Sequence, residues 1–558
     1  MHRMRTWDSS VFEVRSRNRV RDIVGGDGST LSLDFTTVSS LDSRFTFSRS
    51  SPATFINSSG RVGYADHNLF VNTVWTSTST PTGWSGPLLS GTVTWNGNGT
   101  VTMTASSQRP CIFATPAISI SQGVTYAISY RIESISGGTP PISELISSNL
   151  ATDTYYRNGV VVAGSTTVSS GDTIGITFVA AGTTINPRLG PGVSGPVTCT
   201  MTISRPQFNA GSVLQTYLAN SSTSSALQLA RFDYDPSTLA PRGLLIEGSA
   251  TNELTNSETF GTGWTDTNIT RNSTNNTSPA NDSTALRVTA SAANATIIRS
   301  AAMGTSAQRT LSVWLRRVSG TGNIQFTTNN GTAWTTQAIT SSWVRYTFTA
   351  TTEAQQVGFR IVTSGDSIEL WGAQLEANSG ASSYIPTGAS TVQRAADSCS
   401  IALSTFGFNT AEGTFYVDFF RKNVSSGSGS AIATDYASTR WLGIDTASGS
   451  NTVNLNSWGG TTSSANGSTR NKVGASYGAW TGSAVPVSLC VNNTAAVTGN
   501  RDFNPSNATY LTIGAASSSS GTNPPYGVAG RDWLNNCVAA MKYWPVRLPD
   551  NTLRVITA

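Results

Sequence analysis

Apolar and polar residues alternate along many short stretches of this chain. The clearest stretch is 124–132, in which every second residue is a valine, isoleucine or tyrosine; 311–315, 344–348 and 357–361 repeat the alternation. Because successive side chains of a strand point to opposite faces, this pattern predicts sheets with one buried and one wet face. Regularly spaced strands separated by Gly, Asn and Ser turns are typical of β-sandwiches and jelly rolls. We therefore expect an all-β protein of tandem jelly-roll or β-sandwich domains.

One pattern of residues occurs twice, which indicates a duplicated domain. Each copy opens on two Asn residues four positions apart with a Trp after them, and closes on a Gln and a Tyr that lie ten positions apart. The matching positions are Asn68, Trp84, Gln207 and Tyr217 in the first copy and Asn252, Trp264, Gln374 and Tyr384 in the second. The two Trp residues are expected to be structural, because they occupy corresponding places in the repeat.

These signals divide the chain into five parts. A Gly-rich turn at 25–28 ends a basic segment, and two aromatic-rich strands around Gly60 predict a hairpin within 45–62. The last part differs from the repeats and has strong strands at 414–420, 487–491 and 510–514. The predicted division is a basic arm at 1–28, a split β connector at 29–66 plus 225–250, jelly roll 1 at 67–224, jelly roll 2 at 251–397 and a terminal sandwich at 398–558.

The composition limits the cellular compartments in which the protein is expected to be made. Charged residues make up only 12% of the 558 residues, and no run of about 18 apolar residues exists that could span a membrane. The first residues lack the apolar run of a secretion signal, which favours synthesis in a reducing cytosol. Five cysteines, odd in number and without CxxC pairing, are predicted to be reduced and buried: Cys111, Cys199, Cys399, Cys490 and Cys537. A virus particle assembled inside a cell would combine this setting with a polar, Ser- and Thr-rich surface.

The net charge of +5 is unevenly placed, and the N-terminus carries a basic stripe. Arg15, Arg17, Arg19 and Arg21 alternate with other residues, so an extended strand would hold them all on one face. They predict either an arm that docks onto an acidic partner and anchors the protein, or a solvated, poorly ordered terminus. The pattern does not decide between the two.

Three segments stand out in the first half of the chain: FSRSSPAT at 47–54, RFDYDP at 231–236 and RGLLIE at 242–247. Together they resemble segments of bacteriophage virion proteins of the head-fibre or head-spike, tail-fibre and capsid-decoration kinds. The segment 370–376 resembles the closing strand of a carbohydrate-binding-like jelly roll, and 543–550 resembles the end of a concanavalin-like, laminin-G-like sandwich. The chain departs from the family pattern in one respect, because jelly roll 1 separates the two connector pieces.

The resemblance implies a structural protein that projects from the virion surface as a fibre or spike. It would be assembled in the bacterial cytoplasm, anchored by its N-terminal region to capsid or tail proteins, and would contact host-surface polysaccharide. It also implies a homo-oligomer, most often a trimer. Two alternatives remain: a capsid-decoration protein without a receptor role, and a tailspike that degrades polysaccharide.

Candidate catalytic residues are few, and we expect no enzyme. The two histidines, His2 and His67, lie in the arm and in a connector, where no rigid shell is expected to place an imidazole for nucleophilic catalysis. Asp233 and Asp235 share a strand face but precede Pro236, so both are predicted to form a turn. No cofactor is expected. The scattered carboxylates Asp435, Asp445 and Asp532 do not predict a metal site either.

Glycan binding is the functional option that remains in the terminal sandwich. Aromatic rings can stack on sugars, and amide or guanidinium groups can bond their hydroxyls. The candidate residues are Trp458, Asn456, Trp441, Arg440, Trp480 and Trp533. The alternative is that these tryptophans fill the sandwich core or a subunit interface.

Overall fold

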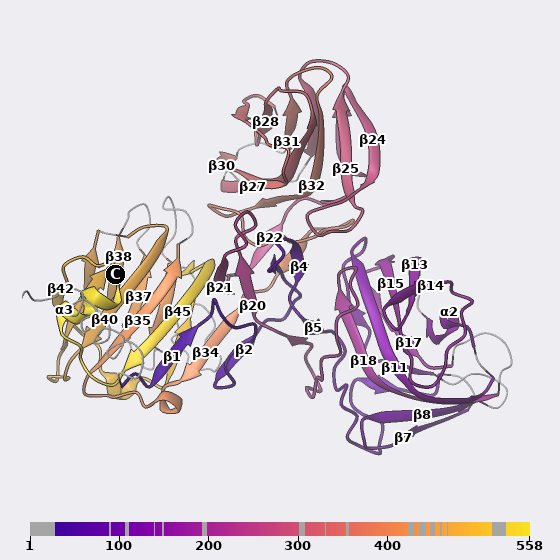
Figure 1. Ribbon diagram of the computed structural model, residues 1–558, viewed down its shortest axis with the longest axis horizontal. Coiled ribbons are helices and arrows are strands. Elements are labelled where there is room, and N and C mark those ends of the chain that lie inside the picture. Colours follow the sequence, from indigo (N-terminus) through magenta and orange to yellow (C-terminus); the bar gives the residue numbers. More distant parts are fainter. Residues whose placement is uncertain are drawn as a thin grey trace, which may run out of the picture.

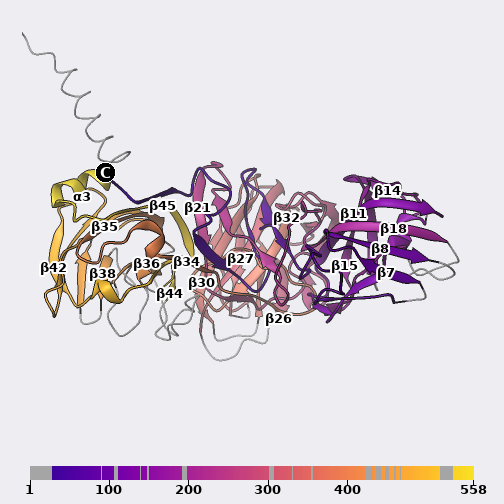
Figure 2. The ribbon, with the colours of Figure 1, turned by 90° about the horizontal axis from the view of Figure 1, so that it is seen from below.

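The computed structural model has three lobes around a central junction (Figure 1). It describes residues 28–558 except 89–90, 106–110, 139, 148–149, 192–197, 301–306, 330, 353–355, 422–428, 435–441, 447–451, 458–459, 466 and 516–531. Seen from below, the C-terminal sandwich, jelly roll 2 and jelly roll 1 form a row (Figure 2). The predicted all-β class is confirmed. Helices in the described part are the short α2 (Ile142–Leu145), η1 (Leu403–Phe406), η2 (Pro505–Asn507) and α3 (Asp550–Ile556).

The C-terminal sandwich packs two large sheets over one apolar core. The first sheet contains β20 (Arg231–Tyr234), β21 (Pro241–Ile246), β45 (Asn536–Trp544), β35 (Gly413–Phe420), β40 (Arg470–Tyr477), β41 (Val485–Val491) and β42 (Val497–Arg501), with β1 (Leu31–Asp34) beside β45. The second contains β2 (Phe45–Ser48), β34 (Ser398–Ala402), β43 (Tyr510–Ile513), β36 (Gly429–Thr434), β37 (Leu442–Thr446), β38 (Val453–Ser457) and β39 (Gly460–Ser464), with β44 (Asp532–Trp533) beside β36.

Much of the expected split connector is built into this sandwich. From 29–66, β1 pairs with β45 and β2 pairs with β34; from 225–250, β20 pairs with β21 and β21 pairs with β45. Strands β1 and β21 lie along the same edge of β45, at successive parts of its length. The core includes Phe35, Phe232 and Ile246 from these segments. Because these early strands pair with strands of 398–558, the sandwich also includes residues of 29–66 and 225–250.

Jelly roll 1 has one wide and one narrow sheet around its own core. The wide sheet runs β14 (Val160–Val162), β13 (Leu150–Arg157), β15 (Thr173–Ala180), β11 (Thr125–Gly137), β18 (Cys199–Ala210), β8 (Thr100–Ala105) and β7 (Thr92–Trp95). The narrow sheet runs β12 (Ile146–Ser147), β17 (Arg188–Leu189), β9 (Ile112–Ala114) and β6 (Trp84–Ser85). Two small pairs are β10 (Ile118–Ser119) with β16 (Thr184–Ile185), and β5 (His67–Asn68) with β19 (Leu227–Gln228).

Jelly roll 2 packs two five-stranded sheets face to face. One runs β23 (Trp264–Thr267), β26 (Ala295–Ser300), β31 (Gln356–Ile361), β28 (Ile324–Thr327) and β29 (Thr335–Gln337). The other runs β24 (Ile269–Asn276), β25 (Ala285–Ala290), β32 (Ser367–Glu376), β27 (Ala307–Ser319) and β30 (Val344–Thr352). The pair β22 (Ala250–Asn252) and β33 (Val392–Arg394) closes the module. Leu311, Val313 and Leu315 are fully buried in its core, as their alternation predicts.

The repeated sequence pattern makes the same hydrogen bonds in both jelly rolls. The Asn68 amide donates to the carbonyls of Pro206 and Leu218, and its oxygen accepts from Phe70 N and Phe208 N. In the second copy, the Asn252 amide donates to two carbonyls and its oxygen accepts two backbone N–H groups in the corresponding places; these are Ala373 O, Ile385 O, Leu254 N and Leu375 N. The duplication predicted from sequence is thus a duplication of structure.

The remaining repeat positions are also structural. The Trp84 and Trp264 indoles each donate to a backbone carbonyl, at 2.9 Å to Val71 O and 3.1 Å to Thr255 O. The Gln207 and Gln374 side chains each accept a backbone N–H from near the matching Tyr, at 3.0 and 2.7 Å. These residues therefore fix how the last strand of each module folds back onto its first.

A hairpin at the centre of Figure 1 connects the modules. It consists of β3 (Thr54–Ile56) and β4 (Val62–Tyr64), which pair antiparallel. Ile56 and Val62 pack against Trp314 and Trp371, on the face of the β25–β32–β27–β30 sheet that points away from its core. The hairpin therefore covers an aromatic face of jelly roll 2.

His67, at the start of jelly roll 1, is completely buried and neutral. Its Nε2 accepts from Ala210 N at 2.8 Å, so Nδ1 carries the proton and donates to Ala65 O at 2.7 Å. Burial lowers the pKa of His67 to about 4. The imidazole therefore links the backbone at Ala65 to the backbone at Ala210, and both of its ring nitrogens are engaged.

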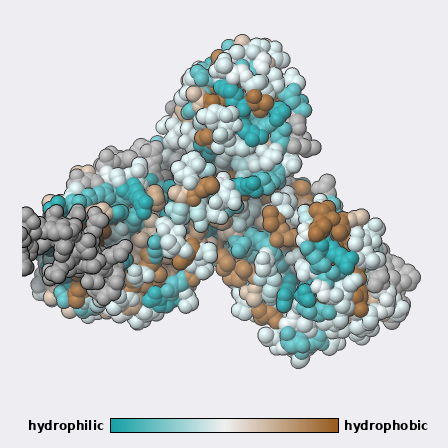
Figure 3. Space-filling view, in the orientation of Figure 1, coloured by the Kyte–Doolittle hydropathy of each residue, from teal (hydrophilic) through white to brown (hydrophobic). Residues whose placement is uncertain are grey.

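All five cysteines are free and buried, as predicted. On the face seen in Figure 3, the three lobes are mostly polar or neutral, with separate apolar areas between. In the part of the chain that the structure describes, no helix has the length and apolar character needed to cross a bilayer.

Candidate functional site

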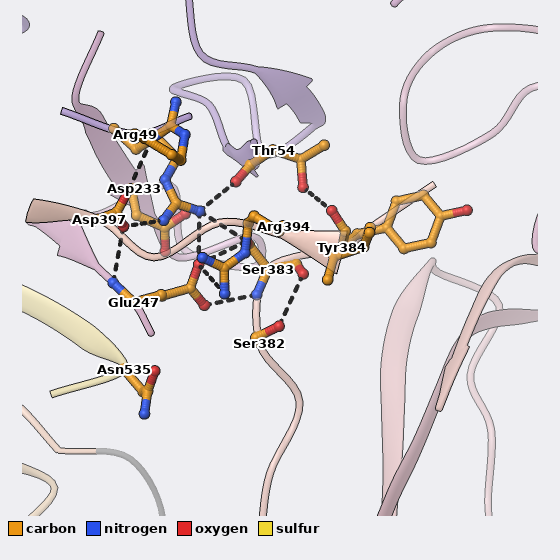
Figure 4. A network of polar contacts seen from close by, with 12 residues as sticks. Arg49, Thr54, Asp233, Glu247, Ser382, Ser383, Tyr384, Arg394, Asp397 and Asn535 are labelled. Atoms are coloured by element: carbon orange, nitrogen blue, oxygen red, sulfur yellow. Dashed lines mark hydrogen bonds and ion pairs between the residues drawn. The ribbon is translucent and has the colours of Figure 1, made fainter. Parts of the chain in front are cut away.

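A buried network of arginines and carboxylates lies where the hairpin, the C-terminal sandwich and jelly roll 2 meet (Figure 4). Arg231 of β20 contacts Glu247 at 2.6 Å and Asp397 at 2.5 Å. Arg49 contacts Asp397 at 2.9 Å, and Arg394 contacts Glu247 at 3.6 Å. The side chains of Arg49, Arg231 and Asp397 are 0% exposed. We call these five residues the junction network.

Neighbouring polar groups complete the junction network. Arg231 Nη1 donates to Thr54 O of the hairpin at 2.9 Å. Ser383, in jelly roll 2, donates to Glu247 through both its backbone N–H and its hydroxyl, at 2.8 and 2.7 Å. Glu247 N donates to Asp397 at 2.9 Å. The junction network therefore joins segments that are far apart in the sequence. Arg49 and Asp397, for example, are 348 positions apart.

The carboxylates of the junction network stay ionised despite their burial. Burial alone would raise the pKa of Glu247, but the charges of Arg394 and Arg231 outweigh it and hold that pKa well below its ordinary value. The pKa of Asp397 is likewise lowered, because Arg231 and Arg49 outweigh burial. Burial lowers the pKa of Arg49 to about 10, so it remains a cation at neutral pH. The junction network is thus a fixed structural element and not a proton donor.

Asp233 and Asp235, predicted as a pair of turn-formers, have different roles. Asp235 does form the turn: its Oδ1 accepts from Ser237 N and Thr238 N at 3.0 and 2.9 Å. For Asp233 the prediction is wrong, because this residue lies within β20 and accepts Ile56 N of the hairpin at 2.8 Å. Burial raises the pKa of Asp233 to about 6.

A cleft of about 440 Å³ lies between jelly rolls 1 and 2, beside the hairpin. We call it the inter-module cleft. Its wall combines aromatic rings with amide groups from all three parts; these residues are Asn57, Tyr64, Gln215, Asn256, Trp371 and Tyr384. Small-molecule sites in proteins commonly lie at such domain boundaries and combine apolar walls with a few polar groups.

Three carboxyl groups also line the inter-module cleft: Asp66, Glu258 and Asp282. Burial, reinforced by the charge of Asp282, raises the pKa of Glu258 to about 8. Glu258 is therefore protonated at neutral pH, and its Oε1 lies 3.2 Å from the Tyr384 hydroxyl. Asp282 is held in place by the hydroxyls of Ser278 and Thr284, at 2.6 and 2.5 Å.

The inter-module cleft suits a neutral ligand with several hydroxyl groups. Its carboxyl and amide groups supply both hydrogen-bond donors and acceptors, and its rings supply apolar contact. Among the lining residues that the structure describes there is no Arg, Lys or His. An anionic ligand would find no countercharge here, because the nearest ionisable groups are acids.

Most of the site residues predicted from sequence either lie outside the described residues or pack against other parts of the protein. The residues that lie outside the described part of the chain are Arg15, Arg17, Arg19, Arg21, Arg440, Trp441 and Trp458. Trp480 is half-buried against the sandwich core. The Trp533 indole donates to Asp397 O at 3.1 Å, and its ring packs over Gly248.

Asn456 lies on β38, and its side chain is already engaged. Its amide donates to Asp445 of β37, and its oxygen accepts from the Thr461 hydroxyl at 2.5 Å. Strand β44, which carries Trp533, pairs with β36, and β37 lies between β36 and β38. Asn456 and Trp533 are therefore not neighbours on the sheet.

No sequence pattern pointed to Glu258 and Asp282, the two carboxyl groups that distinguish the inter-module cleft. Glu258 and Asp282 are 24 positions apart on turns of jelly roll 2, without a shared motif. The repeat pattern did single out Tyr384, although as a structural position. No group of three or more His, Cys, Asp and Glu side chains that could hold a metal ion occurs among the described residues.

No protein-family model and no curated protein matches the chain. Three solved structures illustrate what it is similar to in fold. The sialidase module CBM40 of Ruminococcus gnavus shares 12% identity over 27% of this chain and 84% of its own, with a TM-score of 0.21.

Two longer similarities span more than one module. The tandem CBM22 domains of Paenibacillus barcinonensis Xyn10C share 9% identity over 56% of this chain and 98% of their own, with a TM-score of 0.20. Mouse laminin α1 domains LG4–5 share 11% identity over 47% and 88%, with a TM-score of 0.19. At TM-scores this low, the likeness assigns no role to any residue of this chain.

Proposed function

We propose that this protein is a glycan-binding structural protein that projects from the surface of a bacteriophage particle. The N-terminal region would anchor it to capsid or tail proteins, and the folded modules would contact host-surface polysaccharide, most simply as a homotrimer. The observation that carries glycan binding is the inter-module cleft of about 440 Å³. The virion setting rests on the sequence resemblance.

The chemistry of the inter-module cleft fits a sugar. A sugar ring has an apolar face, which suits the rings of Tyr64 and Tyr384, and hydroxyl groups that both donate and accept. Protonated Glu258 can donate a hydrogen bond, while Asp282 and Gln215 can accept one. Groups held in place before a ligand arrives lose little freedom on binding, and Asp282 is held by two hydroxyls.

The junction supports a structural role. Fully buried ion pairs that bridge distant segments are costly to separate, so they resist changes in the angle between modules. An appendage that must hold a binding site at a defined distance from a particle benefits from such a fixed shape.

Binding can be tested on the full chain by filling the inter-module cleft from an exposed position. Thr259 lines the cleft and is exposed, so Thr259→Trp would fill the space without removing a buried group. Thr262 is also exposed on the same segment but is not among the residues lining the cleft, so Thr262→Trp is a matched control. We expect calorimetric titration with host polysaccharide fragments to show at least about a tenfold loss for Thr259→Trp only. Equal binding by both variants would reject the cleft as the site.

Location on the particle needs a separate measurement. Antibody labelling of intact particles in the electron microscope is expected to mark a surface appendage. Even labelling over the capsid, together with weaker particles when the protein is absent, would instead support a decoration protein.

One observation favours a polysaccharide-degrading tailspike as a second candidate. Glycosidases use two carboxyl groups, one kept protonated by its surroundings and one ionised. Glu258, with its pKa raised to about 8, fits the protonated member of such a pair, and Asp282 is a second carboxyl group in the same cleft. Release of reducing ends from host polysaccharide, lost in Glu258→Gln, would establish this activity; no release by the wild type would leave binding alone.

A further inference from the structure

A second cavity, of about 230 Å³, adjoins the junction network. We call it the junction cavity. It shares Thr54, Val62 and Tyr384 with the inter-module cleft, but its remaining wall comes from different elements. These include Arg242 and Asp233 of the C-terminal sandwich and Arg345 of jelly roll 2. Unlike the inter-module cleft, the junction cavity has two arginines in its wall, together with the carboxylates of Asp233 and Glu247.

Arg345 is the unusual residue of the junction cavity. Its guanidinium stacks over the Trp314 ring, 4.5 Å from the centroid, and donates to Ser382 O and Ser312 Oγ at 2.6 and 3.0 Å. Its Nε is buried and has no hydrogen-bond partner. Within the described residues, Arg345 forms no ion pair with a carboxylate. Burial lowers the pKa of Arg345, although the charges of Glu376 and Glu247 act in the opposite direction.

The charges around the junction cavity do not balance. Ser382 links Arg345 to buried Glu376, because its N–H donates to that carboxylate at 2.7 Å. Arg242 lies 3.8 Å from Asp233. Together with the junction network, the cations are Arg49, Arg231, Arg242, Arg345 and Arg394, and the anions are Asp233, Glu247, Glu376 and Asp397. A surplus of one positive charge therefore lies in a poorly solvated place, which an anion would offset.

We propose that the junction cavity binds a carboxylate group, with Arg345 and Arg242 as its cationic contacts. A planar guanidinium matches a carboxylate geometrically, and Arg345 and Arg242 both line the cavity. The amides of Asn535 and Asn536 line the same cavity and can bond hydroxyl groups carried on the same ligand. The volume is close to the lower end of small-ligand pockets, about 300 Å³, which favours a single ring.

The carboxylate could be part of an acidic sugar residue of a polysaccharide or belong to a small free carboxylate. Titration of the full chain with glucuronate, acetate and glucose separates these sources. We expect glucuronate to bind and glucose to bind far more weakly, since only the first carries a carboxylate. Acetate binding as tightly as glucuronate would support the carboxylate site and assign it to free carboxylates.

Matched arginine variants test the contact itself. Arg345→Gln should weaken glucuronate binding at least about tenfold, the loss expected for a charge-assisted hydrogen bond. Arg360→Gln is the control, because Arg360 also stacks on a Trp, 4.4 Å from the Trp334 centroid, but lies outside the junction cavity. Arg360→Gln should bind as the wild type does.

The outcomes separate this proposal from glycan binding in the inter-module cleft. Unchanged glucuronate binding by Arg345→Gln, or no binding by the wild type, overturns the carboxylate site and leaves the Thr259→Trp test unaffected. If Arg345→Gln fails to fold in a thermal melt, Arg242→Gln provides the same measurement from the half-exposed side of the cavity. Loss of glucuronate binding in Arg242→Gln supports the site, and retention overturns it.

Discussion

Replacing Asp397 by Asn should destabilise the junction strongly while keeping its shape. Asp397 accepts hydrogen bonds from Arg49, Arg231 and Glu247 N at 2.9, 2.5 and 2.9 Å, and its side chain is 0% exposed. The amide of Asn has the same size but no charge, so Glu247 alone would face three guanidiniums. Removing one partner from a buried ion pair costs about 3–5 kcal/mol. For a module of this size, that lowers the melting temperature by roughly 6–20 °C.

Differential scanning calorimetry of the full chain at neutral pH measures this effect. Asp42→Asn is the control, because Asp42 pairs with Arg44 at 2.8 Å on the surface, where an ion pair contributes at most about 1 kcal/mol. The pKa of Asp397 is lowered in the folded protein, so its contribution is present above its ordinary value of 3.8 and is lost as the pH falls further. The difference between wild type and variant should therefore shrink in acid. A melting temperature for Asp397→Asn within about 1 °C of the wild type at neutral pH would refute the reasoning.

Three further predictions concern single residues. His67 has its pKa lowered from 6.5 to about 4, so its contribution to stability is complete above pH 6.5 and lost towards pH 4; an NMR titration midpoint near 6.5 would contradict this. Glu258 has its pKa raised from 4.5 to about 8, so the wild type should lose up to about 4 kcal/mol of stability between about pH 5 and 8. Urea unfolding of Glu258→Gln should show no such loss, and a wild type equally stable at both pH values would count against the shift. Asn68→Ala and Asn252→Ala should each destabilise their own jelly roll by about 2–4 kcal/mol in calorimetry; a change below about 0.5 kcal/mol would show that these bonds are dispensable.

The modules could be predicted from the sequence because their signals are local. Alternation at 311–315 reports directly which side chains face a core, and the structure buries Leu311, Val313 and Leu315. The matching Asn68 and Asn252 could be found because duplicated domains keep the residues that make the same bonds. The role of these two residues, bonding the first strand to the last, was not visible until both strands were placed.

The junction could not be predicted, because it depends on contacts between distant segments. Arg49 and Asp397 are 348 positions apart, and neither stands in a motif that indicates an ion pair. The same holds for Glu258, whose raised pKa results from burial between modules and not from its neighbours in the sequence. Asp233 shows how a local rule fails: its short spacing to Pro236 predicted a turn, whereas pairing with β21 drew it into a strand.

Strands β1 and β21 both pair with β45, which is synthesised long after them, so the C-terminal sandwich can be completed only late in synthesis. Strand β1 pairs through Leu31 with Tyr543, so it is synthesised roughly 500 residues before its partner, a delay of about 25–100 s at typical translation rates. During that time Leu31 and Phe35 have no complete sandwich to pack into, and one edge of β21 stays unpaired. A ribosome that stops before β45 releases a chain in which β1 has no partner strand and β21 is paired only with β20, so the open edges are prone to aggregate. Only a chain translated as far as β45 can therefore close this lobe.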